Sequence, residues 1–230
     1  MTVTPSAARI LYSGPLSLFS RKVEMALGEK GLAFERVMVP FSQERGYAPK
    51  HPAVLAANPK AQVPVLVDGD LTLFDSTLIL EYLEDAYPAP PLFPREARAR
   101  ARCRRLELFA DEILFAPVRL LMYRTEPPHP EREHQAAREA EGARAEAAIR
   151  GHYAGLADEL GERDYFCGDF SVADIALFMT LLFAARLKGP TLGDFPNLAA
   201  WQARMRGRPV IAKVAAEIAE ADRVLSRKAG

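Results

Sequence analysis

The sequence of 230 residues has few of the side chains that usually bind metals. Its two cysteines, Cys103 and Cys167, are too few for a disulfide framework or a cysteine zinc site. Its four histidines are scattered and show no metal-ligand spacing such as HExxH. From these shortages we expect a protein without a metal ion, in which both cysteines are buried structural thiols.

Net charge and long hydrophobic runs are absent too. The 30 Lys and Arg residues balance 30 Asp and Glu residues, which argues against a nucleic-acid binder with a broad basic face. The longest apolar run, Ile175 to Ala185, is shorter than the ~20 residues of a membrane span. The N-terminus lacks the apolar core of a signal peptide. We therefore expect a cytoplasmic protein with no nucleic-acid or membrane partner, and the 23 Arg among the 30 basic residues hint at a GC-rich bacterial genome.

The residues that are present are those of a globular protein, with 49% hydrophobic and 26% charged side chains. One segment is an exception, because Pro88, Pro90, Pro91 and Pro94 fall within seven residues. Proline removes a backbone donor and fixes φ, so this segment cannot be the interior of a helix or a central strand. We interpret 88–94 as a linker between a domain at 1–87 and a domain at 95–230.

The two sides of this linker differ in periodicity. The first side alternates short apolar runs with helical patterns, which predicts an α/β domain. Its expected strands are 9–12, 34–39, 65–67 and 71–74, and its expected helices are 18–30 and one that Ser76 opens as N-cap. The second side is helical throughout, with expected helices at 95–124 (kinked at Pro117), 132–160, 171–187, 198–206 and 209–225.

Three segments of the first domain carry candidate site residues. At the first strand-to-helix junction, the hydroxyls of Ser13, Ser17 or Ser20 could bond an anion held by the helix N-terminus. The alternative is that one of these serines simply caps the helix, and local evidence alone favours this alternative. Val63–Pro64 precedes a strand, and a cis bond there would present the backbone of Val63, although trans is commoner for any such bond.

The third segment is Asp75-Ser76 at the start of a helix. An acid and a hydroxyl placed there could hold the ammonium and carboxylate groups of a ligand. The alternative is an N-cap with a favourable charge at the helix dipole.

Taken in this order, the three segments resemble the cytosolic glutathione transferases. Two later motifs extend the resemblance over nearly the whole chain: Phe170-Ser171-Val172-Ala173-Asp174, and Phe195-Pro196-Asn197-Leu198 followed by Trp201. The resemblance implies a thioredoxin-like α/β N-terminal domain, an all-α C-terminal domain, glutathione as co-substrate, a hydrophobic substrate site between the domains and a homodimer. We assign the box Ser171–Asp174 to folding, as a capping box.

The resemblance also implies roles for individual residues. Ser17 takes the catalytic position of a serine-type enzyme, with Tyr12 and Ser13 as rivals and Ser20 less favoured. The implied glutathione contacts are the backbone of Val63, the family's cis-proline at Pro64, the γ-glutamyl-binding pair Asp75 and Ser76, Lys50 near the glycyl carboxylate (a place that His51 could share), and Gln62. No cysteine lies in this region, which argues against the thiol-exchange classes of the family.

The mechanism that we expect follows from thiol chemistry. A thiolate is the reactive species, and a free cysteine thiol has a pKa of about 8.5. Ser17 would donate a hydrogen bond to the bound thiolate, which attacks small hydrophobic electrophiles in detoxification. The alternatives are a glutathione-dependent isomerase or dehalogenase, and a non-catalytic stress or partner-binding protein with this fold.

Overall fold

The computed structural model describes residues 9–226, which divide into two compact units. The first unit ends at Pro91 and the second begins at Leu92, so the division falls within the segment interpreted above as a linker. Within residues 9–226, no helix is long and apolar enough to cross a membrane.

The first unit is built on a four-stranded mixed sheet with the order β2-β1-β3-β4. The strands are β1 (Ile10–Ser13), β2 (Glu35–Met38), β3 (Val65–Asp68) and β4 (Leu71–Phe74). β1 pairs parallel with β2 and antiparallel with β3, and β3 pairs antiparallel with β4 across the turn at 69–70. The helices are α1 (Leu18–Glu29), α2 (Pro52–Ala57) and α3 (Ser76–Ala86).

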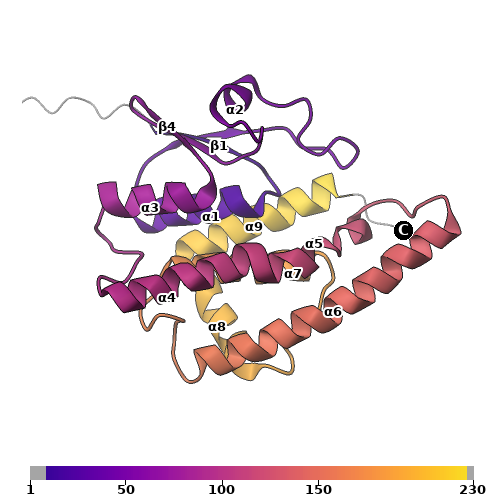
Figure 1. Ribbon diagram of the computed structural model, residues 1–230. Helices are drawn as coiled ribbons and strands as arrows, with labels where there is room; N and C mark the ends of the chain where they lie inside the picture. Colours follow the sequence, from indigo (N-terminus) through magenta and orange to yellow (C-terminus); the bar gives the residue numbers. More distant parts are fainter. Residues whose placement is uncertain (1–8, 227–230) are drawn as a thin grey trace, which may run out of the picture. The chain divides into compact units, whose positions relative to one another are not determined.

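Alternation along the strands gives the sheet two apolar faces. Leu11 and Leu66 point toward α1 and α3 and pack with Val23 and Ile79, and Figure 1 shows both helices on this side of the sheet. On the other face, Val65 packs with Val39 of the β2–α2 loop and Val54 of α2. The first side chains of α1 are therefore held at the end of β1, beside the loop that leads to α2.

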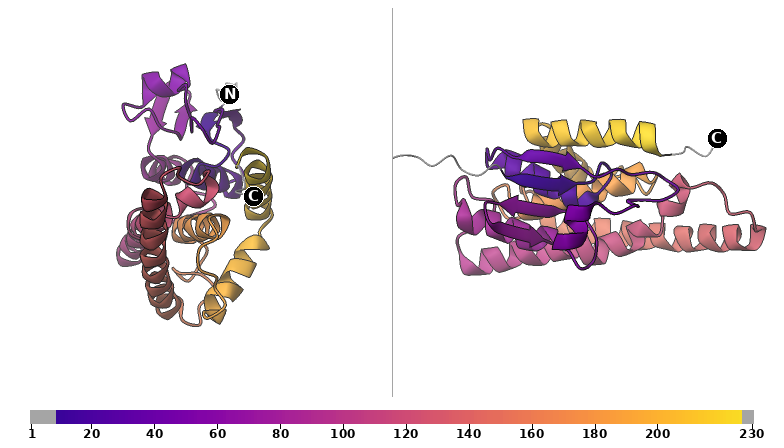
Figure 2. Two further views of the ribbon diagram at one scale, coloured as in Figure 1. Left: turned by 90° about the vertical axis from the view of Figure 1, so that its right-hand side faces the viewer. Right: turned by 90° about the horizontal axis from the view of Figure 1, so that it is seen from above.

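The second unit is helical, as the periodicity predicts. Its helices are α4 (Ala97–Leu108), α5 (Phe115–Arg119), α6 (Arg132–Leu160), α7 (Val172–Arg186), α8 (Pro196–Arg206) and α9 (Pro209–Leu225). α7 is apolar nearly all round and packs against α4, α8 and α9 in the middle of this unit (Figure 2). The capping box of Ser171 and Asp174 is present at its start, so that prediction is confirmed.

The single long helix expected over 95–124 is wrong in detail. α4 ends at Leu108, and a π-helical turn (Phe109–Leu114), α5 and a 3₁₀ turn (Met122–Thr125) follow. Pro117 has no N–H to donate to the carbonyl of Ile113, four residues earlier, and Ile113 lies in this π-helical turn. The sequence locates the disturbance but not its form.

Candidate active site

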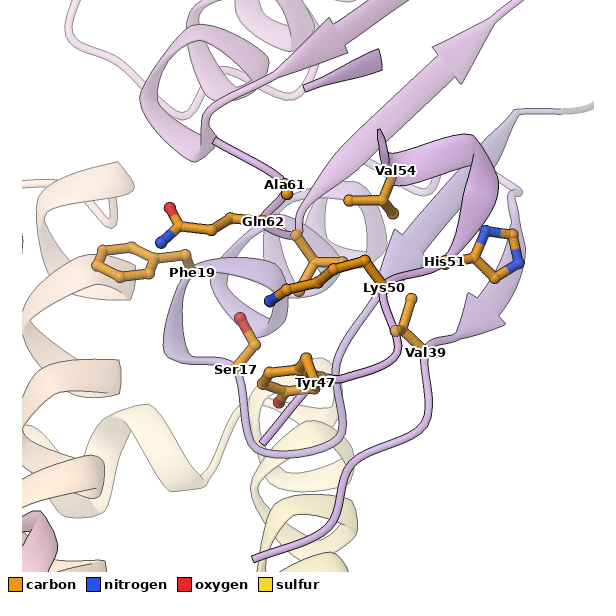
Figure 3. Close-up of a pocket in the computed structure, with 10 residues that line it drawn as sticks. Ser17, Phe19, Val39, Tyr47, Lys50, His51, Val54, Ala61 and Gln62 are labelled. Carbon is orange, nitrogen blue, oxygen red and sulfur yellow. The ribbon is translucent and has the colours of Figure 1, made fainter. Parts of the chain in front are cut away.

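A cavity of about 210 Å³ lies in the first unit at the start of α1. This volume is below the range of roughly 300–1,000 Å³ of sites for drug-sized ligands, so it fits part of a larger molecule. Its walls come from α1, from the loop between β2 and α2, from α2 and from the loop before β3 (Figure 3). The lining residues are Ser17, Phe19, Val39, Tyr47, Lys50, His51, Val54, Ala61, Gln62 and Val63.

Ser17 is both the N-cap of α1 and part of this cavity wall. Its Oγ accepts hydrogen bonds from the backbone N–H of Ser20 (3.3 Å) and from the hydroxyl of Ser20 (3.0 Å). Neither contact commits the hydroxyl proton of Ser17, because the N–H of Ser20 can only donate and either of the two hydroxyls can donate to the other. No acidic residue lies in the first turn of α1, which leaves the positive end of the helix dipole uncompensated there.

The rival hydroxyls are engaged elsewhere. Ser13 is buried and donates to the carboxylate of Glu24. The ring of Tyr12 packs against His51, with 5.0 Å between the ring centroids, in the apolar cluster beneath α2. Neither residue belongs to the cavity wall given above, whereas Ser17 does.

Two of the polar residues predicted from the resemblance reach the same cavity as Ser17. Figure 3 shows the ammonium group of Lys50 directed into the space beside the Ser17 hydroxyl, and Gln62 at the same opening next to Phe19. His51 points away from Ser17 in this view, because its Nδ1 accepts from the backbone N–H of Ala53 (3.2 Å) and caps α2. The lone cation directed at Ser17 among the cavity-lining residues is thus Lys50.

Val63 lies on the rim where the chain enters β3. The Val63–Pro64 peptide bond is cis, and the strand register of β3 with β1 and β4 begins at Val65. The backbone of Val63 therefore lies outside the ladder. The preceding loop is fixed by Asn58, which is buried and whose amide donates to the carbonyl of Gln62 (2.7 Å).

Asp75 and Ser76 stand at the start of α3 and are not among the residues that line the cavity. The expectation that Ser76 is the N-cap is wrong: Asp75 is the N-cap, and its Oδ1 accepts from the backbone N–H of Thr77 (3.0 Å). Asp75 has φ +75°, a conformation that costs a non-glycine residue of order 1–3 kcal/mol and is commonest at functional sites. Lys60 Nζ lies 4.0 Å from Asp75 Oδ2 in an exposed ion pair.

Tyr47 is a cavity residue that the sequence analysis does not identify. Its hydroxyl accepts from the backbone N–H of Leu16 (3.2 Å), which ties the β2–α2 loop to the start of α1. A Cβ added to Gly14 would lie 2.6 Å from atoms of the Tyr47 ring, so this glycine allows the close approach. Gly14 beside the candidate serines was the available signal, but nothing in the sequence indicates which aromatic residue packs on it.

A buried ion-pair network holds this junction in place. The carboxylate of Glu24 accepts from the hydroxyl of Ser13, from Arg21 Nη1 (2.7 Å) and from Arg36 Nη1 (2.9 Å). Arg21 Nε also donates to the carbonyl of Pro15 (3.3 Å). The network therefore joins β1, the β1–α1 loop, α1 and β2. Among the described residues, no group of three or more His, Cys, Asp or Glu is arranged to hold a metal ion.

Comparison with known families identifies the class of protein. Residues 11–91 match the model described as "Glutathione S-transferase, N-terminal domain", and residues 112–209 match "Glutathione S-transferase, C-terminal domain". These matches cover most of the chain, which belongs to the glutathione S-transferase family. The expected fold, a thioredoxin-like domain followed by an all-helical domain, is confirmed.

The relatives of this chain carry names that refer to different functions. The probable maleylacetoacetate isomerase of Vibrio cholerae is 30% identical over 213 residues, which are 90% of this chain and 95% of that protein. The stringent starvation protein A homolog of Coxiella burnetii is 43% identical over 98 residues, which span 42% of this chain and only 43% of that protein. A solved structure, a glutathione S-transferase of Methylobacterium radiotolerans in complex with glutathione sulfonate, is 30% identical with a TM-score of 0.74, covering 91% of this chain and 95% of that one.

Proposed function

We propose that this protein is a serine-type glutathione transferase in which Ser17 stabilises the thiolate of bound glutathione for attack on small hydrophobic electrophiles. The observation that carries the proposal is the Ser17 hydroxyl, which caps α1, lines the cavity and accepts from Ser20 with its oxygen. The relative with glutathione sulfonate bound supports the choice of ligand.

The residues around the cavity fit glutathione in charge and in chemistry. Lys50 offers a cation for the glycyl carboxylate, and the backbone of Val63 lies outside the strand ladder, where it can pair with a peptide. We propose that Gln62 adds a contact, that Pro64 keeps the backbone of Val63 presented, and that Asp75 and Ser76 hold the γ-glutamyl end beyond the cavity.

The energy required is within reach of these groups. Lowering a thiol pKa from about 8.5 by two units takes about 2.7 kcal/mol of preferential thiolate stabilisation. A hydrogen bond to a charged group contributes about 1.5–3 kcal/mol, and a helix N-terminus contributes about 0.3–1 kcal/mol at an exposed site. Ser17 and the start of α1 together supply this amount.

The test is a set of substitutions read out by the pKa of bound glutathione, measured as thiolate absorbance against pH. Ser17→Ala should raise that pKa by about 1–2 units and lower kcat at neutral pH by roughly 10-fold or more, with much of the rate recovered at alkaline pH. Ser17→Gly removes the same hydroxyl at a smaller capping cost of a few tenths of a kcal/mol, and should behave in the same way.

Two controls complete this experiment. Ser17→Thr keeps a hydroxyl and a capping oxygen and should keep the low thiol pKa. Tyr12→Phe removes a hydroxyl outside the cavity wall and should leave the thiol pKa unchanged. An unaltered pKa in both Ser17→Ala and Ser17→Gly would contradict the role of Ser17, and a shift in Tyr12→Phe would move that role to Tyr12.

A glutathione-dependent isomerase is the second candidate, because the maleylacetoacetate isomerase relative matches over 95% of its own length. An isomerase and a transferase share the need for a bound thiolate but differ in their product. Assays of the purified enzyme with a haloaromatic electrophile and with maleylacetoacetate distinguish them. Turnover of the second substrate without net consumption of glutathione would replace the transferase assignment.

A further inference from the structure

The two cysteines lie together in the second unit. Cys103 is on α4 and is fully buried, whereas Cys167 is on the loop between α6 and α7 and is only partly buried. Cys167 lies against α4 beside Cys103, because it shares a cavity wall with Ala99 and Arg102 of that helix. The two thiols interact electrostatically with each other and with the side chain of Ser171. The expectation of two buried structural thiols is therefore wrong for Cys167, which is partly exposed on this loop.

Cys167 lines a basic cavity of about 310 Å³. Three guanidinium-bearing side chains, those of Arg98, Arg102 and Arg163, share its wall with Ala99, Phe166, Cys167 and Gly168. Glu159 neutralises part of this charge, because its carboxylate bonds Arg102. Its uncharged backbone carbonyl accepts from Arg163. The remaining positive charge favours an anion at this site, including the thiolate form of Cys167 itself.

The surroundings make Cys167 the more reactive of the two thiols. The hydrogen bond from Cys103 lowers the pKa of Cys167, helped by Ser171 and by the charge of Arg102, against burial and the charge of Asp174. The same hydrogen bond, together with burial, raises the pKa of Cys103. Cys167 is thus the thiol that ionises first and the one that a solvent-borne reagent meets.

We propose that Cys167 and Cys103 form a reversible redox pair whose oxidant is a hydroperoxide. The Cys167 thiolate attacks one oxygen of the hydroperoxide, the O–O bond breaks, and the products are a sulfenic acid on Cys167 and an alkoxide or hydroxide that takes up a proton. The sulfur of Cys103 then attacks the sulfur of Cys167. The S–O bond breaks, the thiol proton of Cys103 leaves with the hydroxide as water, and a disulfide remains.

The overall reaction is balanced: two thiols and one hydroperoxide give one disulfide, one alcohol or water molecule, and a second water molecule. The cysteines lose two electrons, and the hydroperoxide gains them. Cys167 lies on a turn between α6 and α7. This turn contains Gly168 at φ +90° and is closed by the bond from the N–H of Gly168 to the carbonyl of Tyr165 (3.1 Å).

The test is exposure of the full-length reduced protein to hydrogen peroxide, followed by alkylation in denaturant and intact mass spectrometry. The wild type should lose two hydrogens, take up no alkylating agent, and give a cross-linked peptide containing Cys103 and Cys167. Dithiothreitol should restore both alkylation sites. In Cys103→Ser, or Cys103→Ala if serine impairs folding, Cys167 should stop at a sulfenic acid that dimedone traps.

Matched variants test the assigned roles. In Cys167→Ser, the buried Cys103 should stay reduced under the same exposure. Arg102→Gln should slow the oxidation of Cys167 by about 3- to 10-fold, because the thiolate loses a nearby cation. Arg105→Gln should retain the wild-type rate, since Arg105 also bonds Glu159 but does not line the cavity.

Three results would overturn the proposal. The first is a wild type whose two thiols remain alkylatable at a peroxide dose that oxidises Cys167 in Cys103→Ser. The second is a dimedone adduct as stable in the wild type as in Cys103→Ser, because Cys103 would then not resolve the sulfenic acid. The third is a disulfide between two Cys167 residues of different molecules as the main product.

Discussion

The start of α7 depends on one buried carboxylate, and replacing it tests the energetics of the second unit. Asp174 Oδ1 accepts from the backbone N–H of Phe166 (3.1 Å) and from Trp201 Nε1 (3.0 Å). Its Oδ2 accepts from the N–H and the hydroxyl of Ser171, both at 3.0 Å. These bonds connect α7 to the loop before it and to α8, so their loss should lower the free energy of unfolding.

The cost can be estimated donor by donor. Ser171→Ala should cost about 1 kcal/mol, the usual value of an N-cap. In Asp174→Asn the amide oxygen can face Phe166 and Trp201, and the Ser171 hydroxyl can turn to accept from the amide nitrogen. Only the N–H of Ser171 then loses its acceptor, at about 1–3 kcal/mol. Asp174→Ala leaves three N–H donors without an acceptor and should cost about 3 kcal/mol or more.

Urea unfolding followed by tryptophan fluorescence measures this series. Trp201 is the single tryptophan and is fully buried, so its emission reports the unfolding of the second unit. The free energy of unfolding should fall in the order Ser171→Ala, Asp174→Asn, Asp174→Ala. If Asp174→Ala costs no more than Ser171→Ala, the carboxylate does not hold the start of α7 and the reasoning fails.

The pH dependence gives the same experiment a second readout. Burial raises the pKa of Asp174, although its four hydrogen bonds oppose this shift. A folded pKa above the unfolded value means that the folded state binds the proton more tightly, so stability falls as pH rises through the interval between the two. Asparagine does not titrate. The stability advantage of the wild type over Asp174→Asn should therefore shrink as pH rises through that interval, and an advantage that grows would show that the hydrogen bonds outweigh burial.

Two further predictions concern the first unit. Gly14→Ala places a Cβ 2.6 Å from the Tyr47 ring and should cost about 1–3 kcal/mol of stability, which would lower Tm and weaken glutathione binding in calorimetry. Adding Tyr47→Leu to this variant should restore part of the lost Tm. If Tm does not recover, the clash with Tyr47 is not the cause of the loss. Glu24→Gln removes a carboxylate that pairs with the buried Arg21 and should cost about 3–5 kcal/mol, measured by urea unfolding followed by far-ultraviolet circular dichroism. An unchanged unfolding midpoint would contradict a stabilising role of the network.

The sequence predicts those elements whose ends are marked by local chemistry. α6 and α9 begin and end at the expected residues, 132–160 and 209–225. Glycine follows the first of these helices and proline begins the second. The form of the π-helical turn after α4 was not predictable, because Pro117 marks where a helix is disturbed but not which kind of turn replaces it. Cys167 was misjudged for a related reason, since its exposure depends on how its loop lies over α4.

The residues of the candidate site also fall into those that sequence motifs mark and those that only the structure reveals. The cavity residues Ser17, Lys50, Gln62 and Val63 were predictable through the order of motifs along the chain. Tyr47 was not, because it comes from the irregular loop between β2 and α2, where no periodicity constrains which side chain turns inward. Asp75 was singled out by its motif, but its left-handed backbone and its role as N-cap required the structure.

Ser17 and Ser171 show why a capping serine is ambiguous in sequence and distinguishable in structure. Both are helix N-caps, and the local pattern alone favours plain capping for each. The Ser171 hydroxyl, almost fully buried, donates its proton to Asp174 within the capping box. Ser17 instead contacts the backbone N–H and the hydroxyl of Ser20 and lies on a cavity wall with Lys50, so its proton can turn to a partner in the cavity. The surroundings of the two hydroxyls thus separate a serine that completes a fold from one that can hold a thiolate, because a carboxylate lies beside Ser171 and a cavity beside Ser17. This difference is what the Ser17 variants measure.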